Sequence, residues 1–156
     1  MNMMNPSSHP LPLTPFQGFT LGWIRYAEFH GRSSRMEFWS FQIITFFLQF
    51  LLSLVSLGIL GVIFQLVVLV PSFSVWVRRL HDTGRSGLWV LWVVAAVFPA
   101  FFILRAESIA GVIFLFLAAI AMLLIPYIMC FADGDPETNQ YGPNPKLNPT
   151  NPSHPV

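Results

Sequence analysis

Two long apolar stretches dominate the chain, and a short polar segment separates them. The 40 residues from Phe38 to Val77 and the 19 residues from Ser86 to Leu104 contain no Asp, Glu, Lys, Arg or His. Between them, residues 78–87 read Arg-Arg-Leu-His-Asp-Thr-Gly-Arg-Ser-Gly, a segment we call the knot. Uncharged stretches of this length are typical of membrane-spanning helices. The knot is therefore expected where water meets lipid.

The first apolar stretch is too long for a single span. As one helix it would measure about 60 Å, roughly twice the thickness of the hydrocarbon layer. Residues 56–61 carry two glycines and no charge, which predicts a tight turn there. The whole pattern predicts an all-α polytopic membrane protein, a bundle of four transmembrane helices. Their expected ranges are about 37–57, 59–78, 86–104 and 109–130.

The ends of the chain differ from this membrane domain, which we place at residues 16–132. Residues 1–15 and the polar tail 133–156 are rich in Pro, Ser and Asn, so we expect a disordered extension and a disordered Pro-rich tail with at most local polyproline structure. Within residues 16–29, aromatic residues recur every three or four positions. This spacing predicts a short helix lying in the membrane interface, or equally one packed against other protein.

Capping signals place the start of the first span. Gly31 can end the helix that precedes it, and Ser34 with Glu37 forms the Ser-x-x-Glu pattern of a capping box. The first membrane helix is therefore expected to begin near Arg35.

Uncharged polar residues line one face of the first span and continue on the second. They recur at helical spacing, and polar groups are costly against lipid, so the stripes should face each other or the bundle interior. Hydrogen bonding between helices is one interpretation, and a hydrated path for a solute is the other. The stripe comprises Gln42, Thr45, Gln49, Ser53, Gln65 and Ser72, with Ser56 at the end of the first span.

Composition agrees with the pattern and excludes several classes of protein. Hydrophobic residues make up 54% of the chain and charged residues only 10%, as in integral membrane proteins. Cys130 is the single cysteine, which rules out an intrachain disulfide and a cysteine-based metal site. The net charge of +1 says little by itself, but six of the seven arginines lie in two short clusters, a distribution that indicates membrane orientation and makes nucleic acid an unexpected partner.

The distribution of arginine predicts the orientation. Three Arg residues precede the first span and three lie in the knot, whereas Arg105 alone lies on the other side. Basic residues concentrate on the cytoplasmic side of membrane proteins, so both termini are expected in the cytoplasm.

Three motifs together resemble a known family. They are Gly31-Arg32-x-Ser34-Arg35-x-Glu37-Phe38-Trp39, the knot, and Asn139-x-Tyr141-Gly142-Pro143-Asn144-Pro145. In this order they resemble the YhaH-like small bacterial inner-membrane proteins, known as domain of unknown function 805. The resemblance covers roughly Tyr26 to Pro145 and implies a four-span protein of the bacterial inner membrane. It implies no activity, because none is established for that family.

Charged side chains from two of these motifs should share one membrane depth. The favoured interpretation is that they form ion pairs that fix how two helical hairpins dock, with Glu37 in reach of Arg78 or Arg79 and Asp82 paired to an arginine or capping a helix. A second is that the arginines bind phosphates of anionic lipids. The candidate cluster comprises Arg32, Arg35, Glu37, Arg78, Arg79, His81, Asp82 and Arg85.

Catalysis or metal binding is the third interpretation of this region. His81 and Asp82 are adjacent, so on a helix they point about 100° apart and form no dyad by themselves. Adding Asp133, Asp135 and Glu137 gives a set that could hold a divalent cation, but the spacing matches no metal motif.

The sequence thus predicts a small scaffold or interaction protein of the inner membrane, with no enzymatic activity, cofactor or metal. Its expected partners are the lipid bilayer, anionic headgroups, and a membrane protein or a second copy of this chain. The alternative is small-solute permeation or a role as a transporter accessory. A dry interface between the two polar stripes would favour a scaffold, and a polar path through the bundle would favour permeation.

Overall fold

A computed structural model describes residues 12–95, 98–99, 102 and 108–147 of the chain. In these residues all regular structure is helical, apart from one isolated bridge between Asn139 and Gly142. The elements are α1 (Pro15–Ile24), α2 (Arg35–Val55), α3 (Ile59–Asp82), the 3₁₀ helix η1 (Gly87–Val90), α4 (Leu91–Ala95) and α6 (Ile109–Phe131).

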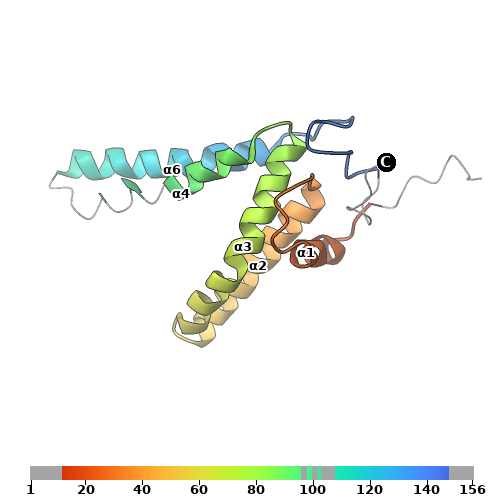
Figure 1. Cartoon of the computed structure of the whole chain (residues 1–156). Helices are drawn as coiled ribbons and strands as arrows, with labels where there is room; N and C mark the ends of the chain where they lie inside the picture. Colours follow the sequence, from red (N-terminus) through yellow and green to blue (C-terminus); the bar gives the residue numbers. More distant parts are fainter. Residues whose placement is uncertain (1–11, 96–97, 100–101, 103–107, 148–156) are drawn as a thin grey trace, which may run out of the picture.

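Helices α2 and α3 form an antiparallel hairpin (Figure 1). The hydroxyl of Ser34 accepts a hydrogen bond from the backbone N–H of Glu37, so Ser34 is the expected N-cap. The reciprocal half of the expected capping box does not form, because the Glu37 carboxylate pairs with Arg78. The hairpin turn uses left-handed backbone at Leu57 and Gly58, where glycine is favoured. Helix α3 runs to Asp82, past its predicted end at residue 78, because its charged last turn is paired with other parts of the chain.

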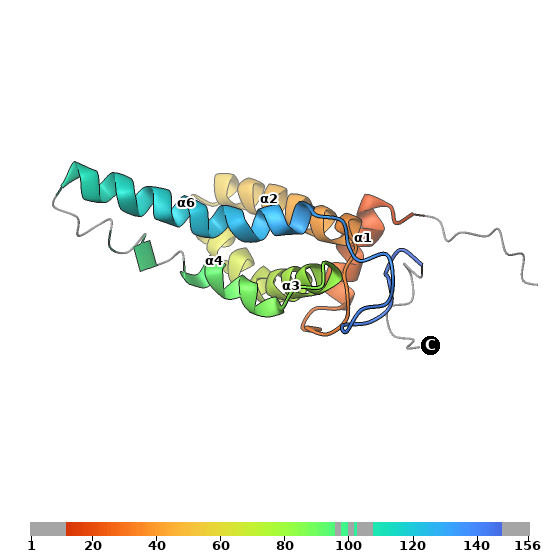
Figure 2. The same cartoon turned by 90° about the horizontal axis from the view of Figure 1, so that it is seen from above.

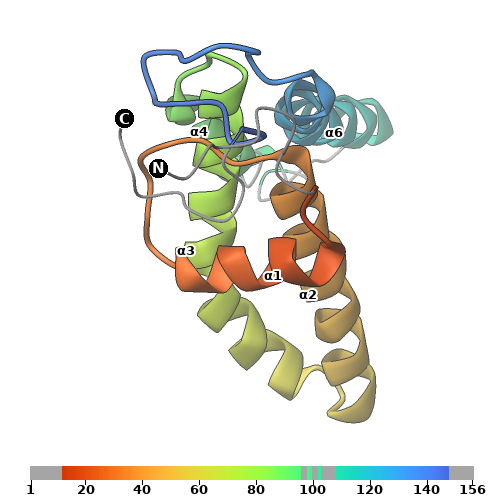
Figure 3. The same ribbon diagram turned by 90° about the vertical axis from the view of Figure 1, so that its right-hand side faces the viewer.

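Helix α1 is shorter than the predicted helix 16–29 and packs on α2. It crosses the hairpin instead of following it (Figure 3). Gly22 lets the backbone approach Phe41, since a Cβ at this position would lie 2.2 Å from the ring of Phe41. The opposite face of α1 exposes Phe16 and Ile24. The helix ends at Ile24 because the next residue, Arg25, turns its side chain into the protein.

A second hairpin pairs η1 and α4 with the antiparallel helix α6, and it diverges from the first hairpin (Figures 1 and 2). Helix α6 matches the predicted span 109–130. Part of the predicted span 86–104 lies outside the described residues, so a fourth membrane helix stays a prediction. In the described part of the chain, α2, α3 and α6 are long and apolar enough to cross a membrane.

The prediction of a disordered tail is wrong for residues 133–147. This segment folds back over the end of α3, where the N–H of Asp135 donates to the carbonyl of Asp82 at 2.8 Å. Proline-rich composition gave the wrong expectation because side-chain amides and turns, not an apolar core, fix the segment. The expectation of a disordered extension is also wrong for residues 12–15, since Thr14 caps α1 and Pro15 begins it. Residues 1–11 and 148–156, the rest of the expected disordered ends, lie outside the described residues.

Candidate functional site

Four segments meet at the end of α3 that carries the knot. They are the loop before α2, the last turn of α3, the end of α6 and the segment 133–147. The backbone itself joins two of them to α3, since the N–H of Ser33 donates to the carbonyl of Arg78 at 3.1 Å. We call the charged side chains buried at this junction the clasp; they are Arg25, Arg32, Glu37, Arg78, Arg79 and Asp82.

One half of the clasp centres on Glu37, whose carboxylate is buried. Its Oε1 lies 2.5 Å from Nη1 of Arg78 and its Oε2 lies 3.7 Å from Nη1 of Arg25. Arg25 also forms two hydrogen bonds to Glu28, which hold the pKa of the Glu28 carboxyl below its usual value. Two guanidinium groups therefore share two carboxylates, and the charge of this half is balanced. These pairs tie α2, α3 and the turn after α1 together.

Arg32 organises the other half from the loop before α2. Its Nε donates to Oδ1 of Asp82 at 2.9 Å. Its two terminal nitrogens donate to backbone carbonyls of the C-terminal segment, at 2.5 Å to Asp135, 2.6 Å to Glu137 and 3.2 Å to Gly142. The side chain is 1% exposed. The planar guanidinium group of Arg32 thus donates to one carboxylate, that of Asp82, and to several backbone carbonyls of the C-terminal segment.

Arg79 connects the clasp to α6. It is also fully buried, and it pairs with the second carboxylate oxygen of Asp82. Its remaining donors reach the carbonyls of Cys130 at 3.1 Å and Ala132 at 2.5 Å. These carbonyls belong to the C-terminal end of a helix, where the aligned peptide dipoles favour a positive charge. The positive charge that Asp82 alone cannot balance is stabilised in this way.

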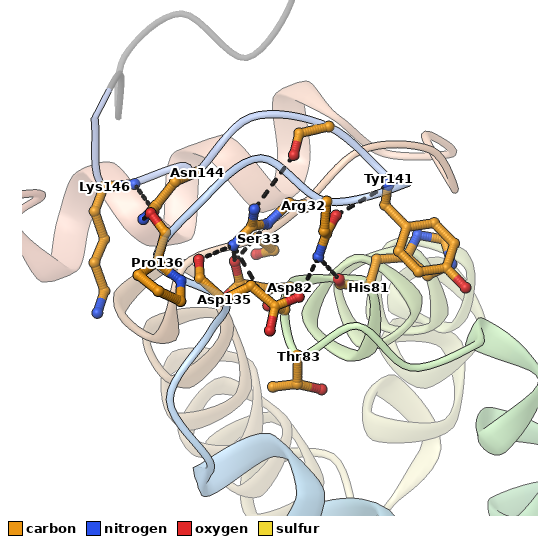
Figure 4. A network of polar contacts seen from close by, with 12 residues as sticks. Arg32, Ser33, His81, Asp82, Thr83, Asp135, Pro136, Tyr141, Asn144 and Lys146 are labelled. Atoms are coloured by element: carbon orange, nitrogen blue, oxygen red, sulfur yellow. Dashed lines mark hydrogen bonds and ion pairs between the residues drawn. The ribbon is translucent and has the colours of Figure 1, made fainter.

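The C-terminal segment is held on the clasp by side-chain amides (Figure 4). Asn139 donates to the carbonyl of His81 at 2.9 Å and to the carboxylate of Asp135 at 2.6 Å. Asn144 donates to the carbonyl of Pro136 at 2.8 Å. The ring of Tyr141 stacks on the ring of His81 with centroids 3.8 Å apart. The segment therefore covers the end of α3.

The remaining charges of the predicted cluster lie outside the buried clasp. Arg35 is 40% exposed and pairs with Asp133 at 2.8 Å, with Lys146 3.7 Å from the same oxygen. Arg85 forms only a 3.4 Å hydrogen bond to Thr83. Among the lysines and arginines that the structure describes, Arg35, Lys146 and Arg85 are thus the ones that external anions can reach.

The expected ion pairs of Glu37 with Arg78 and of Asp82 with arginine are confirmed. The expected role of Glu37 in docking two hairpins is corrected. Glu37 joins α2 to α3 within one hairpin, whereas Arg79 makes the contacts to the end of α6. The reason is that the carbonyls at the end of α6 offer acceptors that the sequence pattern does not display.

The proposed catalytic or metal-binding set does not come together. His81 turns its Nδ1 to the carbonyl of Gly31 at 3.2 Å, while Asp82 faces Arg32 and Arg79. Asp133 and Asp135 are engaged by Arg35 and Asn139. Over the described ranges, no group of three or more His, Cys, Asp or Glu side chains could hold a metal ion.

The polar stripe lies on the side of the first hairpin that faces the second. Most of it lines a cavity of about 620 Å³, bordered also by Val93 of α4 and Tyr127 of α6. Ser53 instead packs against Gly61 at the α2–α3 contact. The cavity-lining members of the stripe are Gln42, Thr45, Gln49, Gln65 and Ser72.

Several residues in and around the clasp were not predicted from the sequence. Arg25 is 6% exposed and touches Glu37, although it was expected in the interface. Ser74 is buried and donates to the carbonyls of Arg25 and Glu28, which anchors the turn after α1. Asn139 and Asn144 lie in a motif noticed only for its resemblance to a family. Asn144 lies between two prolines and Asn139 lies three residues before Gly142, and this combination of turn-forming residues is the signal for a fixed turn.

Comparison with known proteins agrees with the motifs. Residues 26–143 match the family described as "Protein of unknown function (DUF805)". Inner membrane protein YhaH of Escherichia coli strain K12 is 33% identical over 135 residues, which is 80% of this chain and 92% of YhaH. Inner membrane protein YhaI of the same strain is 32% identical over 87 residues, which is 47% of this chain and 74% of YhaI. No solved structure matches the chain.

Replacing Glu37 by Gln should strongly destabilise the folded protein. The substitution removes the carboxylate that neutralises Arg78, and breaking a buried pair in this way costs about 3–5 kcal/mol. Replacing Glu37 and Arg78 together by Met should restore most of the loss, because no unpaired charge is then buried. Denaturant unfolding in detergent measures both effects.

The matched control is Asp133→Asn, which removes a carboxylate from the exposed pair with Arg35. Surface pairs contribute less than about 1 kcal/mol, so this variant should unfold close to wild type. Equal stability of Glu37→Gln and wild type would show that the clasp does not hold the helices.

Proposed function

The chain belongs to the DUF805 family, and because its relatives are inner membrane proteins, we propose that it is a small, non-catalytic scaffold protein of the bacterial inner membrane. The observation that carries this proposal is the clasp. Its buried arginines are committed to carboxylates and backbone carbonyls that join the helices and the C-terminal segment. Because these charged side chains bind other segments of the same protein, they support a structural role.

A non-catalytic role is also supported by the surroundings of His81, the one histidine of the knot. Its ring stacks on Tyr141, and its Nδ1 approaches a backbone carbonyl. The neighbouring Asp82 is bound by two arginines. A general base needs a free position toward a substrate proton, and this arrangement supplies none at Nδ1.

Anionic lipid is the proposed partner at the cytoplasmic surface, and the exposed bases are its proposed ligands. A cavity of about 370 Å³ combines Arg35 and Lys146 with the apolar groups of Pro12, Leu13 and Met36. Arg35 and Lys146 outnumber their acid, Asp133. A lipid phosphate between two basic groups, with acyl carbons against the apolar wall, fits this chemistry. Buried Arg32, Arg78 and Arg79 take no part in it.

Both termini are proposed to lie in the cytoplasm. The arginines before α2 and those of the knot gather at one end of the first hairpin, and the segment 133–147 packs on the same end. Positive charge concentrates on the cytoplasmic side of inner membrane proteins. The C-terminal segment then shares that side with the clasp.

Small-solute permeation is the second candidate function. One observation favours it: most of the polar stripe lines a cavity instead of forming a dry contact between α2 and α3. The hydrogen bond from Gln49 to the carbonyl of Gly61 still ties these helices together at 2.9 Å. The cavity is bordered by exposed residues such as Ile43 and Phe46, which supports a lateral recess more than a pore.

The double variant Arg35→Gln, Lys146→Gln should bind phosphatidylglycerol about tenfold more weakly, or weaker still, because each basic group near a phosphate contributes about 1 kcal/mol. Native mass spectrometry of the detergent-purified chain, titrated with phosphatidylglycerol, measures the bound fraction. Arg85→Gln is the matched control, since it also removes a reachable positive charge but lies outside this cavity. An equal loss from the control, or no loss from the double variant, contradicts the proposed lipid site.

A reporter test checks the orientation. Alkaline phosphatase, which is active only outside the cytoplasm, should be silent when fused after the last residue and active when fused after residue 106, between the expected third and fourth spans. A fluorescent protein at the C-terminus should give the complementary result. Strong phosphatase activity from the C-terminal fusion would reverse the orientation.

A further inference from the structure

The cavity between the two hairpins lies within the apolar helices. Its walls come from α2 and α3, and it is closed toward the second hairpin by Val93 and Tyr127. A volume of about 620 Å³ is within the range of small-molecule sites, roughly 300–1,000 Å³. The clasp lies at one end of both hairpins and fixes the distance between the helices that form the cavity walls.

Several polar groups that line the cavity lack partners. Oε1 of Gln49 is buried without a hydrogen bond, while its Nε2 donates to the carbonyl of Gly61. The side chains of Gln42, Gln65 and Ser72 form no hydrogen bond to the described part of the chain. An unsatisfied polar group in a lipid environment is costly. These groups are therefore expected to meet a polar occupant.

The chemistry of the walls limits this occupant to uncharged molecules. No Asp, Glu, Lys, Arg or His is among the described residues that line the cavity. A charged group would lose its hydration there without a counter-ion, at high cost. Amides and hydroxyls instead suit a neutral head that both donates and accepts hydrogen bonds.

The rest of the wall suits an apolar body. Aromatic rings from both hairpins border the cavity, including Trp39, Phe73, Trp76 and Tyr127. The exposed residues Ile43 and Phe46 lie at its edge, on the outer surface of α2. A ligand dissolved in the bilayer can reach the cavity along this edge. The site thus combines lateral access, an apolar wall and a cluster of neutral polar groups.

We propose that this cavity binds a neutral, membrane-soluble amphiphile whose head carries hydroxyl and carbonyl groups. The ligand hydroxyl donates to the amide oxygen of Gln42, and the amide N–H of Gln65 donates to the ligand carbonyl. Diacylglycerols have this chemistry. The site is separate from the headgroup site at Arg35 and Lys146, and either can exist without the other.

Fluorescence quenching tests the proposal on the full chain in phosphatidylcholine nanodiscs. Replacing Trp23, Trp89 and Trp92 by Phe leaves Trp39 and Trp76, both at the cavity, as reporters. Titration with a dibrominated diacylglycerol should quench them saturably. Dibrominated phosphatidylcholine with the same chains carries a charged headgroup and should quench weakly and without saturation.

Gln65→Leu is the decisive variant, because Gln65 is exposed and makes no hydrogen bond that folding depends on. It should weaken diacylglycerol binding about fivefold, the effect of one hydrogen bond. Gln140→Leu makes the same change outside the cavity and should bind as the parent does. Non-saturable quenching, equal quenching by phosphatidylcholine, or an unchanged Gln65→Leu titration overturns the proposal. The same titration of the chain with all five tryptophans repeats the test if the triple Phe variant does not fold.

Discussion

Charge at the membrane boundary must be neutralised inside the protein, and this constraint shapes the junction of the helices. Arg78 and Arg79 are fully buried at the end of an otherwise apolar helix. A buried guanidinium without a partner would cost several kcal/mol. Glu37 neutralises the charge of the first arginine through Nη1 alone, and Asp82 with the carbonyl groups at the end of α6 binds the second. Each arginine therefore requires a different segment of the chain to be in place.

This requirement connects the clasp to the cavity in the membrane. The pair between Glu37 and Arg78 sets the spacing of α2 and α3, while Arg79 holds the end of α6 beside them. From that fixed end the two hairpins diverge (Figure 1), and most of the polar stripe lines the cavity between them. Polar side chains within the spans can lack hydrogen-bond partners in the protein only because the ion pairs of the clasp stabilise the junction of the helices.

The helices could be predicted from sequence because their signals are local and strong. Uncharged runs of the right length, the Ser34 cap and the glycine of the hairpin turn each act over a few residues. The ion pair of Glu37 could also be predicted, because Glu37 and the arginines of the knot have opposite charges and the same expected depth in the membrane. The C-terminal segment could not be predicted, because Asn139 and Arg32 interact with backbone carbonyls, which every residue carries. Composition correctly marks that segment as polar but does not reveal those partners.

The pair between Arg32 and Asp82 joins the loop before α2 to the last turn of α3 through one buried contact. A double-mutant cycle with Arg32→Gln, Asp82→Asn and the combined variant measures its coupling directly, from unfolding free energies in detergent. If the clasp organises the fold, the coupling should be roughly 2 kcal/mol, near the upper part of the range for contacting residues. Additive losses, within about 0.5 kcal/mol, would show that the two side chains act independently and would contradict the central role of the clasp.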